Sequence, residues 1–171
     1  MANGACGLRK TEDLIVKQFF MKSMVVIIFL SHAYAYSSSQ SSYSFKVYLK
    51  DQVIEVFRDG ILLKKMPCST GIKPGSTPPG KFKTSQREEK VSWVEKDGTE
   101  IKFYYVTRFN AHISFHSMLE GKHPFVDEGK KLFSERKPSS MGCVRLKKED
   151  AKWVYSLPLG ATVEVMVSGT P

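Results

Sequence analysis

The chain has 171 residues, enough for one domain with a substantial hydrophobic core and a short appendage. Its hydrophobic content of 42% is ordinary for a globular protein, which argues against a disordered chain. The net charge of +9 is compatible with binding to nucleic acid or to an anionic polymer outside the cell. The lysines are scattered, however, and form no basic stripe with interleaved aromatic residues, so we expect no nucleic-acid binding.

The N-terminal segment has the pattern of a secretory signal. An apolar run at residues 24–30 follows a segment that carries lysines and precedes the small-residue site Ala33-Tyr34-Ala35. The run is too short for a bilayer span, which takes about 20 apolar residues. We therefore predict that residues 1–35 are a signal peptide, cleaved after about Ala35, and that the protein is exported to the cell envelope. If translation began at Met21, the signal peptide would be shorter and more typical. The alternative to a cleaved signal peptide is an uncleaved anchor at the membrane surface.

Strand patterns dominate the predicted domain, residues 43–171, which follows a serine-rich linker at 36–42. Asp59-Gly60 and Asp97-Gly98 each separate two apolar runs. Asp-Gly is a strong hairpin signal, because both central residues of a type I′ turn need a positive φ. We predict strands at residues 45–49, 53–57, 61–63, 91–94, 101–106 and 163–167.

Only one segment, residues 147–157, has a helical pattern, with Ala151, Val154 and Tyr155 sharing one face. There is no internal repeat. The sequence therefore predicts a mainly β single domain, a sandwich or partly closed barrel, with one packed C-terminal helix.

The cysteines leave two interpretations open. Cys6 lies in the removable segment, so Cys68 and Cys143 remain in the exported part. Two cysteines in an exported protein are compatible with a disulfide. No CxxC is present, which disfavours a redox motif or a structural zinc site, and a free thiol used for chemistry is the competing interpretation.

Two short segments have the composition of a nucleophilic site. A predicted apolar strand ends at His116, and Cys143 follows Gly142, with Arg145 two residues later. A free thiol has a pKa of about 8.5, so a thiolate near neutral pH needs a base or a positive charge beside it. Gly142 would let the backbone turn so that N–H groups around Cys143 hold an oxyanion, and His116 could carry the thiol proton to a leaving amine. Taken alone, a histidine that ends a strand or a buried free cysteine is more often structural, and it is their combination with an export signal that favours cysteine chemistry.

Several ordered motifs resemble the L,D-transpeptidase catalytic domain family, also called YkuD. The segment Ser140-Met141-Gly142-Cys143-Val144-Arg145 is similar to the family signature S-x-G-C-[IV]-R. The resemblance extends over about residues 43–167. Its other motifs are Cys68-Ser69-Thr70-Gly71, Thr77-Pro78-Pro79-Gly80-Lys81-Phe82, Phe115-His116-Ser117, and the closing helix and strand at 150–155 and 159–163.

The resemblance implies a cysteine acyltransferase that acts on peptidoglycan stem peptides. Cys143 would attack the carbonyl that joins an L-residue to a terminal D-residue, with His116 as base, and the amine of a neighbouring stem would resolve the acyl-enzyme into a cross-link. Arg145 would bind the donor carboxylate or brace the nucleophile loop, with a structural salt bridge as the alternative, and Ser117 would orient His116 or line the pocket. The predicted oxyanion and nucleophile loop consists of Ser140, Met141 and Gly142.

The chain departs from the family pattern in two places. Met141 stands where many members have histidine, and we expect it to pack rather than react. The segment between His116 and Cys143 is longer than is common in the family, and its charged part, residues 120–137, is predicted to form an active-site loop or lid.

The resemblance also bears on partners and alternatives. We expect acylation by carbapenems, no cofactor and no stable protein partner, and the positive charge would suit anionic wall polymers. A zinc site at His112 and His116 is rejected, because on a strand they would lie about 13 Å apart. Two other functions are considered: an L,D-carboxypeptidase, if water resolves the acyl-enzyme, and a non-catalytic secreted wall-binding module.

Overall fold

The protein is described by a computed structural model that covers residues 42–169, so the predicted signal peptide and all but the last residue of the predicted linker lie outside the described part. Within that part no helix is long and apolar enough to cross a membrane. The elements are β1 (Tyr43–Tyr48), β2 (Val53–Arg58), β3 (Ile61–Pro67), β4 (Gly80–Lys83), β5 (Gln86–Val94), β6 (Glu100–Asn110), β7 (Ile113–Ser117), α2 (Pro124–Ser134), β8 (Val144–Leu146), α3 (Lys148–Ser156) and β9 (Thr162–Met166).

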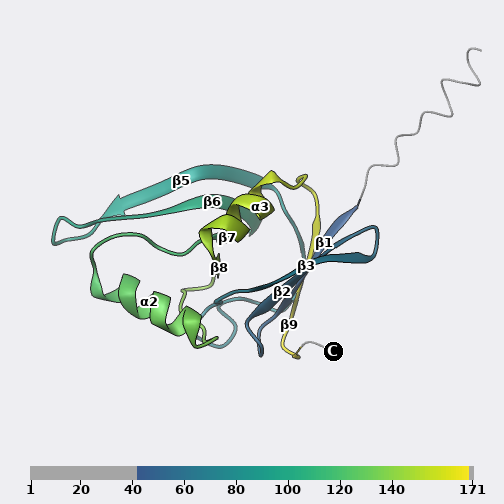
Figure 1. Ribbon diagram of the computed structural model, residues 1–171, viewed down its shortest axis with the longest axis horizontal. Coiled ribbons are helices and arrows are strands. Elements are labelled where there is room, and N and C mark those ends of the chain that lie inside the picture. Colours follow the sequence, from purple (N-terminus) through teal and green to yellow (C-terminus); the bar gives the residue numbers. More distant parts are fainter. Residues whose placement is uncertain (1–41, 170–171) are drawn as a thin grey trace, which may run out of the picture. The chain divides into compact units, whose positions relative to one another are not determined.

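The strands form two sheets, visible in Figure 1. One has five strands in the order β3-β2-β1-β9-β4, with a parallel β1–β9 pair at its centre. The other has four strands in the order β5-β6-β7-β8, and its β7–β8 pair is parallel. The mainly β prediction is confirmed, and the described strands do not close into a barrel.

The two Asp-Gly pairs form different turns. Asp59 and Gly60 have φ of 52° and 81°, as a type I′ turn requires, and join β2 to β3 directly. The second pair, Asp97-Gly98, lies in the β5–β6 connection, and of these two residues only Gly98 has a positive φ, 85°. The N–H of Gly98 donates to the carbonyl of Glu95 at 3.0 Å. The second hairpin was therefore predicted correctly but has a longer loop.

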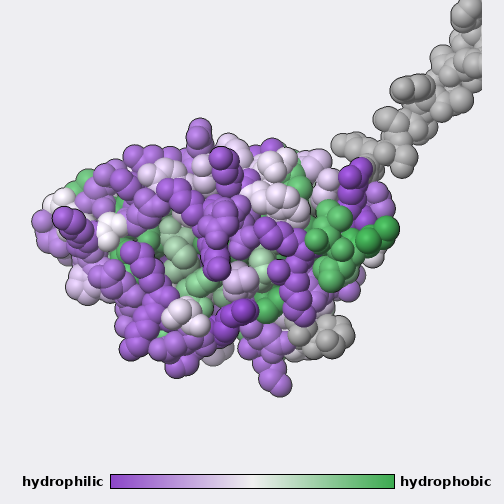
Figure 2. Space-filling model, in the orientation of Figure 1, coloured by the Kyte–Doolittle hydropathy of each residue, from purple (hydrophilic) through white to green (hydrophobic). Residues whose placement is uncertain are grey.

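The core lies between the sheets and α3. Phe45 of β1 packs on Phe115 of β7, with ring centroids 5.2 Å apart, so both sheets contribute to one cluster. Figure 2 shows a largely hydrophilic surface with a hydrophobic patch at the right, where β3 exposes Ile61, Leu62 and Leu63.

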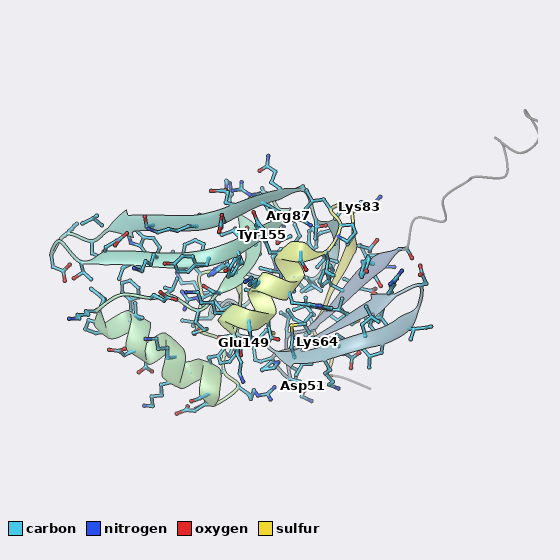
Figure 3. All side chains as sticks on the ribbon, turned by 45° about the horizontal axis from the view of Figure 1, so that its top comes forward. Asp51, Lys64, Lys83, Arg87, Glu149 and Tyr155 are labelled. Atoms are coloured by element: carbon cyan, nitrogen blue, oxygen red, sulfur yellow. The ribbon has the colours of Figure 1, made fainter. Side chains whose placement is uncertain are left out.

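Helix α3 confirms the predicted helix and attaches to both sheets. Its residues Ala151 and Val154 are buried in the core. Lys64 of β3 pairs with Asp150 in the first turn at 2.6 Å, where a carboxylate also suits the helix dipole. On the other side, Arg87 of β5 lies over the ring of Tyr155 at 5.4 Å, and both are labelled in Figure 3.

The prediction of a single helix was wrong, because α2 occupies part of the segment that was expected to be a loop. Pro124 is favourable in the first turn of a helix, and the His123 ring caps the helix by accepting from the N–H of Phe125 at 3.4 Å. Val126 is buried against Ile101 and so attaches α2 to the hairpin strand β6.

Candidate active site

The parallel pairing of β7 with β8 brings the two predicted segments together. Its register sets His116 opposite Arg145 and Phe115 opposite Val144. Because side chains alternate along a strand, His116, Cys143 and Arg145 share one face of the sheet, whereas Phe115 and Val144 lie in the core on the other face. Sheet topology thus places the candidate base beside the candidate nucleophile.

That face opens into a cleft of about 800 Å³. The β5–β6 hairpin, the start of α2, the region of β7, and residues 139–143, which contain the predicted nucleophile loop, contribute most of its lining. Ser76, Trp93, Glu95, Phe103, His112, Ile113, His116, Leu119, Phe125, Ser139, Ser140, Met141, Gly142, Cys143 and Arg145 line it.

His116 is held in a defined orientation. Its side chain is 3% exposed, its ring lies 4.2 Å from that of Phe103, and Nδ1 is 2.7 Å from the carbonyl oxygen of Ser117. A carbonyl only accepts, so Nδ1 carries the hydrogen and Nε2 of the neutral ring is left as the proton acceptor.

Burial makes His116 a neutral imidazole at ordinary pH. Desolvation lowers the pKa of His116 to about 4, the positive charge of Arg145 acts in the same direction, and the Ser117 carbonyl opposes both. The ring therefore binds a proton weakly.

Cys143 is a thiol rather than a resting thiolate. Its Sγ lies 3.7 Å from the carbonyl oxygen of His112, to which an S–H can donate. Burial raises the pKa of the thiol, while the backbone N–H of Ser114 and the charges of Arg145 and Arg108 oppose the increase. A neutral thiol and a neutral imidazole therefore line the same cleft.

Gly142 is required by the geometry of the nucleophile loop. Its φ is 150°, and a Cβ there would lie 2.5 Å from the carbonyl oxygen of Ser76. The Thr77 hydroxyl donates to the carbonyl of Gly142 at 2.6 Å and accepts from the N–H of Gly71 at 2.9 Å. The segment around Gly71 and Thr77 thus fixes the turn before the cysteine.

Ser140 organises the same loop. Its hydroxyl donates to the carbonyl of Cys143 at 2.5 Å and accepts from the N–H of Gly142 at 3.0 Å. The carbonyl of Thr70 accepts from the backbone of both Ser139 and Ser140. The N–H of Gly142 would therefore have to exchange partners before it could bind an oxyanion.

Arg145 braces the loop. Its Nη1 donates to the carbonyl of Ser139 at 2.7 Å and contacts the Ser139 hydroxyl at 3.2 Å, while its buried Nε has no partner. The ion pairs within residues 42–169 do not include Arg145, so the salt-bridge alternative is not seen there. Its charge remains available to the cleft.

Two predicted site residues lie differently from expectation. The Ser117 side chain is buried outside the cleft lining, and its hydroxyl accepts from the N–H of Tyr104 and donates to the carbonyl of Met118, both at 2.9 Å. Its carbonyl, not its hydroxyl, orients His116. Met141 is 97% exposed at the cleft, so the expectation that it packs was wrong.

The predicted alternative of a disulfide is excluded, because Cys68 and Cys143 are both free. Cys68 is completely buried in the core, and burial raises the pKa of its thiol. Its neighbour Ser69 exchanges two backbone hydrogen bonds with Arg145, at 2.9 and 2.8 Å, which places Cys68 beneath the site but not in the cleft.

Sequence reasoning missed the far wall of the cleft. Trp93, Glu95 and Phe103 belong to the hairpin, and Phe125 to α2. The hairpin was predicted, but no local pattern indicates that its side chains line a cleft with a cysteine 40 to 50 positions further along the chain.

Comparison with known proteins identifies the family. The model of the YkuD L,D-transpeptidase catalytic domain matches residues 42–165. The chain belongs to the L,D-transpeptidase catalytic domain family. The resemblance stated from the motifs is thereby confirmed, and no curated protein matches the chain.

Solved L,D-transpeptidases share the fold. One from Stackebrandtia nassauensis is 25% identical with a TM-score of 0.56, over 76% of this chain and 58% of that one. An L,D-transpeptidase in complex with imipenem is 23% identical with a TM-score of 0.57, over 74% and 59% of the two chains. L,D-transpeptidase 3 from Mycobacterium tuberculosis, with a faropenem-derived adduct, is 22% identical with a TM-score of 0.56, over 74% and 60%. The present chain spans less than two thirds of each of these proteins.

Proposed function

We propose that this protein is a cysteine L,D-transpeptidase that cross-links peptidoglycan stem peptides through an acyl-enzyme on Cys143. The observation that carries the proposal is the placement of Cys143 and His116 in one cleft, on one face of the β7–β8 pair. Membership of the L,D-transpeptidase family supports the reaction class.

In the first half-reaction, Sγ of Cys143 attacks the carbonyl carbon of the donor's scissile amide. Nε2 of His116 takes the thiol proton as the C–S bond forms, and then gives it to the departing nitrogen as the C–N bond breaks. A thioester and a free terminal D-residue result. The low pKa of His116 favours immediate return of the proton to the leaving amine.

The second half-reaction reverses these roles. The acceptor's amine attacks the thioester carbonyl, Nε2 takes the excess proton from the nitrogen, and the proton passes to sulfur as the C–S bond breaks. A new amide joins the two stems and Cys143 is restored as a thiol. Attack by water instead would release a shortened stem, which is the carboxypeptidase outcome.

Arg145 contributes positive charge in this mechanism. It opposes the burial that raises the pKa of Cys143, so it favours negative charge on the sulfur as attack begins. Its guanidinium, braced on Ser139, would also attract the donor's carboxylate into the cleft.

Carbapenems and related β-lactams would acylate the same sulfur. The related proteins found in complex with imipenem and with a faropenem-derived adduct support this proposal for Cys143.

The test is a defined reaction with a synthetic tetrapeptide donor and a stem-peptide acceptor, with products separated by liquid chromatography and mass spectrometry. We expect cross-linked dimers with the unchanged protein and none with Cys143→Ala. Shortened monomers alone would identify a carboxypeptidase, and no conversion by the unchanged protein would contradict an enzymatic function.

A further inference from the structure

The cleft carries one carboxylate among its described lining residues, Glu95, and the proposed reaction gives it no role. Glu95 lies on the β5–β6 connection, and its backbone is fixed there, because its N–H donates to the carbonyl of Thr99 at 2.9 Å and its carbonyl accepts from the N–H of Gly98 at 3.0 Å. Both bonds close the neck of the loop. The carboxylate therefore starts from a defined position on the cleft wall.

The side chain of Glu95 is held by an aromatic neighbour. The indole N–H of Trp93 donates to Oε1 of Glu95 at 2.5 Å, which leaves Oε2 to a ligand. None of the ion pairs within residues 42–169 includes Glu95. A carboxylate fixed beside an indole and without a cation is suited to a ligand ammonium group, which both the charge and the ring face attract.

An aromatic path connects this pair to the reacting atoms. The Trp93 ring lies 6.0 Å from that of Phe103, and Phe103 lies 4.2 Å from His116. Backbone hydrogen bonds fix the strand that carries Phe103. Lys102 and Glu120 exchange two of them, of 2.9 and 2.8 Å, so the segment before α2 is attached to the hairpin strand β6. Glu95 and Trp93 thus line the same cleft as Cys143.

The charges in the cleft are separated. Arg145 lies on the β8 side, on the same face as Cys143, and Glu95 lies on the hairpin wall. A peptide with a carboxylate near its reacting end and an ammonium group on a side chain would be attracted in one orientation and repelled in the other.

We propose that Glu95 and Trp93 bind the side-chain ammonium group of a diamino acid in the stem peptide and so determine substrate specificity. This inference rests on the proposed transpeptidase function. The ammonium could belong to the donor, at the residue whose carbonyl is attacked, or to the acceptor, and the two half-reactions distinguish these sources.

The test uses matched peptides that carry lysine or norleucine at that residue, so that only the ammonium group differs. Acylation of full-length protein by each donor is measured without acceptor. Aminolysis of a common acyl-enzyme is measured with lysine- and norleucine-containing acceptors that share the same free α-amine, and only the product formed at that α-amine is counted. We expect a preference of about tenfold for lysine in one half-reaction, lost in Glu95→Gln and retained in part by Glu95→Asp. A preference in acylation assigns the site to the donor, and one confined to aminolysis assigns it to the acceptor.

Two controls separate this inference from the function on which it rests. Glu89→Gln changes an exposed glutamate of β5 outside the cleft lining and should keep the preference. Acylation by faropenem, which has no ammonium group, should be equal in Glu89→Gln and unchanged protein, and it reports the reactivity of Cys143 without the ammonium site. The ammonium site is overturned if Glu95→Gln and unchanged protein show an equal lysine preference, or if neither half-reaction shows a preference. The proposed function itself is overturned if neither faropenem nor either donor acylates the unchanged protein.

Discussion

At the scale of single residues, the site depends on a backbone turn that only glycine can make. We predict that Gly142→Ala reduces acylation by faropenem by two orders of magnitude or more, because the new Cβ would lie 2.5 Å from the Ser76 carbonyl oxygen and displace Cys143. The same substitution should cost about 1–3 kcal/mol of unfolding free energy, because φ is 150°.

Gly75→Ala is the matched control for this prediction. Gly75 also has a positive φ, 79°, but its Cβ would meet nothing within 4 Å. We expect a loss of stability in thermal melts from the positive φ alone, with near-normal acylation. Equal acylation rates in the two variants would show that the close contact at Gly142 does not position the nucleophile.

Burial of His116 predicts a pH-dependent stability. The pKa of His116 falls from 6.5 in the unfolded chain to about 4 in the fold, so the unfolded state binds the proton first as the pH drops. The stabilisation is complete above pH 6.5 and is lost between pH 6.5 and 4, to a total of roughly 3 kcal/mol. Denaturant unfolding at several pH values should show this slope in unchanged protein and a shallower one in His116→Gln.

His112→Gln provides the control for the pH measurement, since His112 is exposed. It should keep the full slope. A slope that survives in His116→Gln would mean that other groups cause it.

The residue scale also shows what the sequence could predict. Cys143, His116 and Gly142 were selected from the sequence because a nucleophile, a base and a tight turn each require particular residue types, and the structure places all three in one cleft. Met141 was misjudged, because an apolar side chain carries no sign of its direction in a loop, and it is 97% exposed. Glu95 gave no signal, because its importance arises only from the cleft around it.

At the scale of elements, helix α2 was missed because Pro124, Gly129 and many charges obscure its short apolar face. Its only buried residues are Val126 and Gly129, and a Cβ at Gly129 would lie 3.1 Å from Nη1 of Arg145. Strands and hairpins were easier to predict, because alternation and Asp-Gly turns are local patterns. The helix is specified instead by what it packs against.

We predict that Val126→Ala loosens the cleft wall. Val126 is 1% exposed and packs with Ile101 and Leu119, so truncation should cost about 2 kcal/mol in denaturant unfolding. Amide hydrogen exchange should accelerate in α2, while Lys131→Ala on its exposed face leaves exchange unchanged. Faster exchange throughout the core instead would show that α2 is not a separate packing unit.

At the scale of the whole molecule, export is a proposal from the sequence alone. We predict that protein made in a bacterial host with an intact export pathway appears outside the cytoplasm, with Tyr36 as its first residue in N-terminal sequencing. Replacing apolar residues at 24–30 by charged ones should retain the protein in the cytoplasm. Full-length protein in the cytoplasm of the unmodified strain would contradict a cleaved signal.

The proposed activity depends on His116 and Cys143 acting together in one cleft. Intact-mass and peptide-mass measurements after exposure to faropenem test this most directly. We predict a single adduct on Cys143, none with Cys143→Ala, and acylation at least about 10²-fold slower with His116→Ala. An adduct on another residue, or an unchanged rate in His116→Ala, would contradict the account.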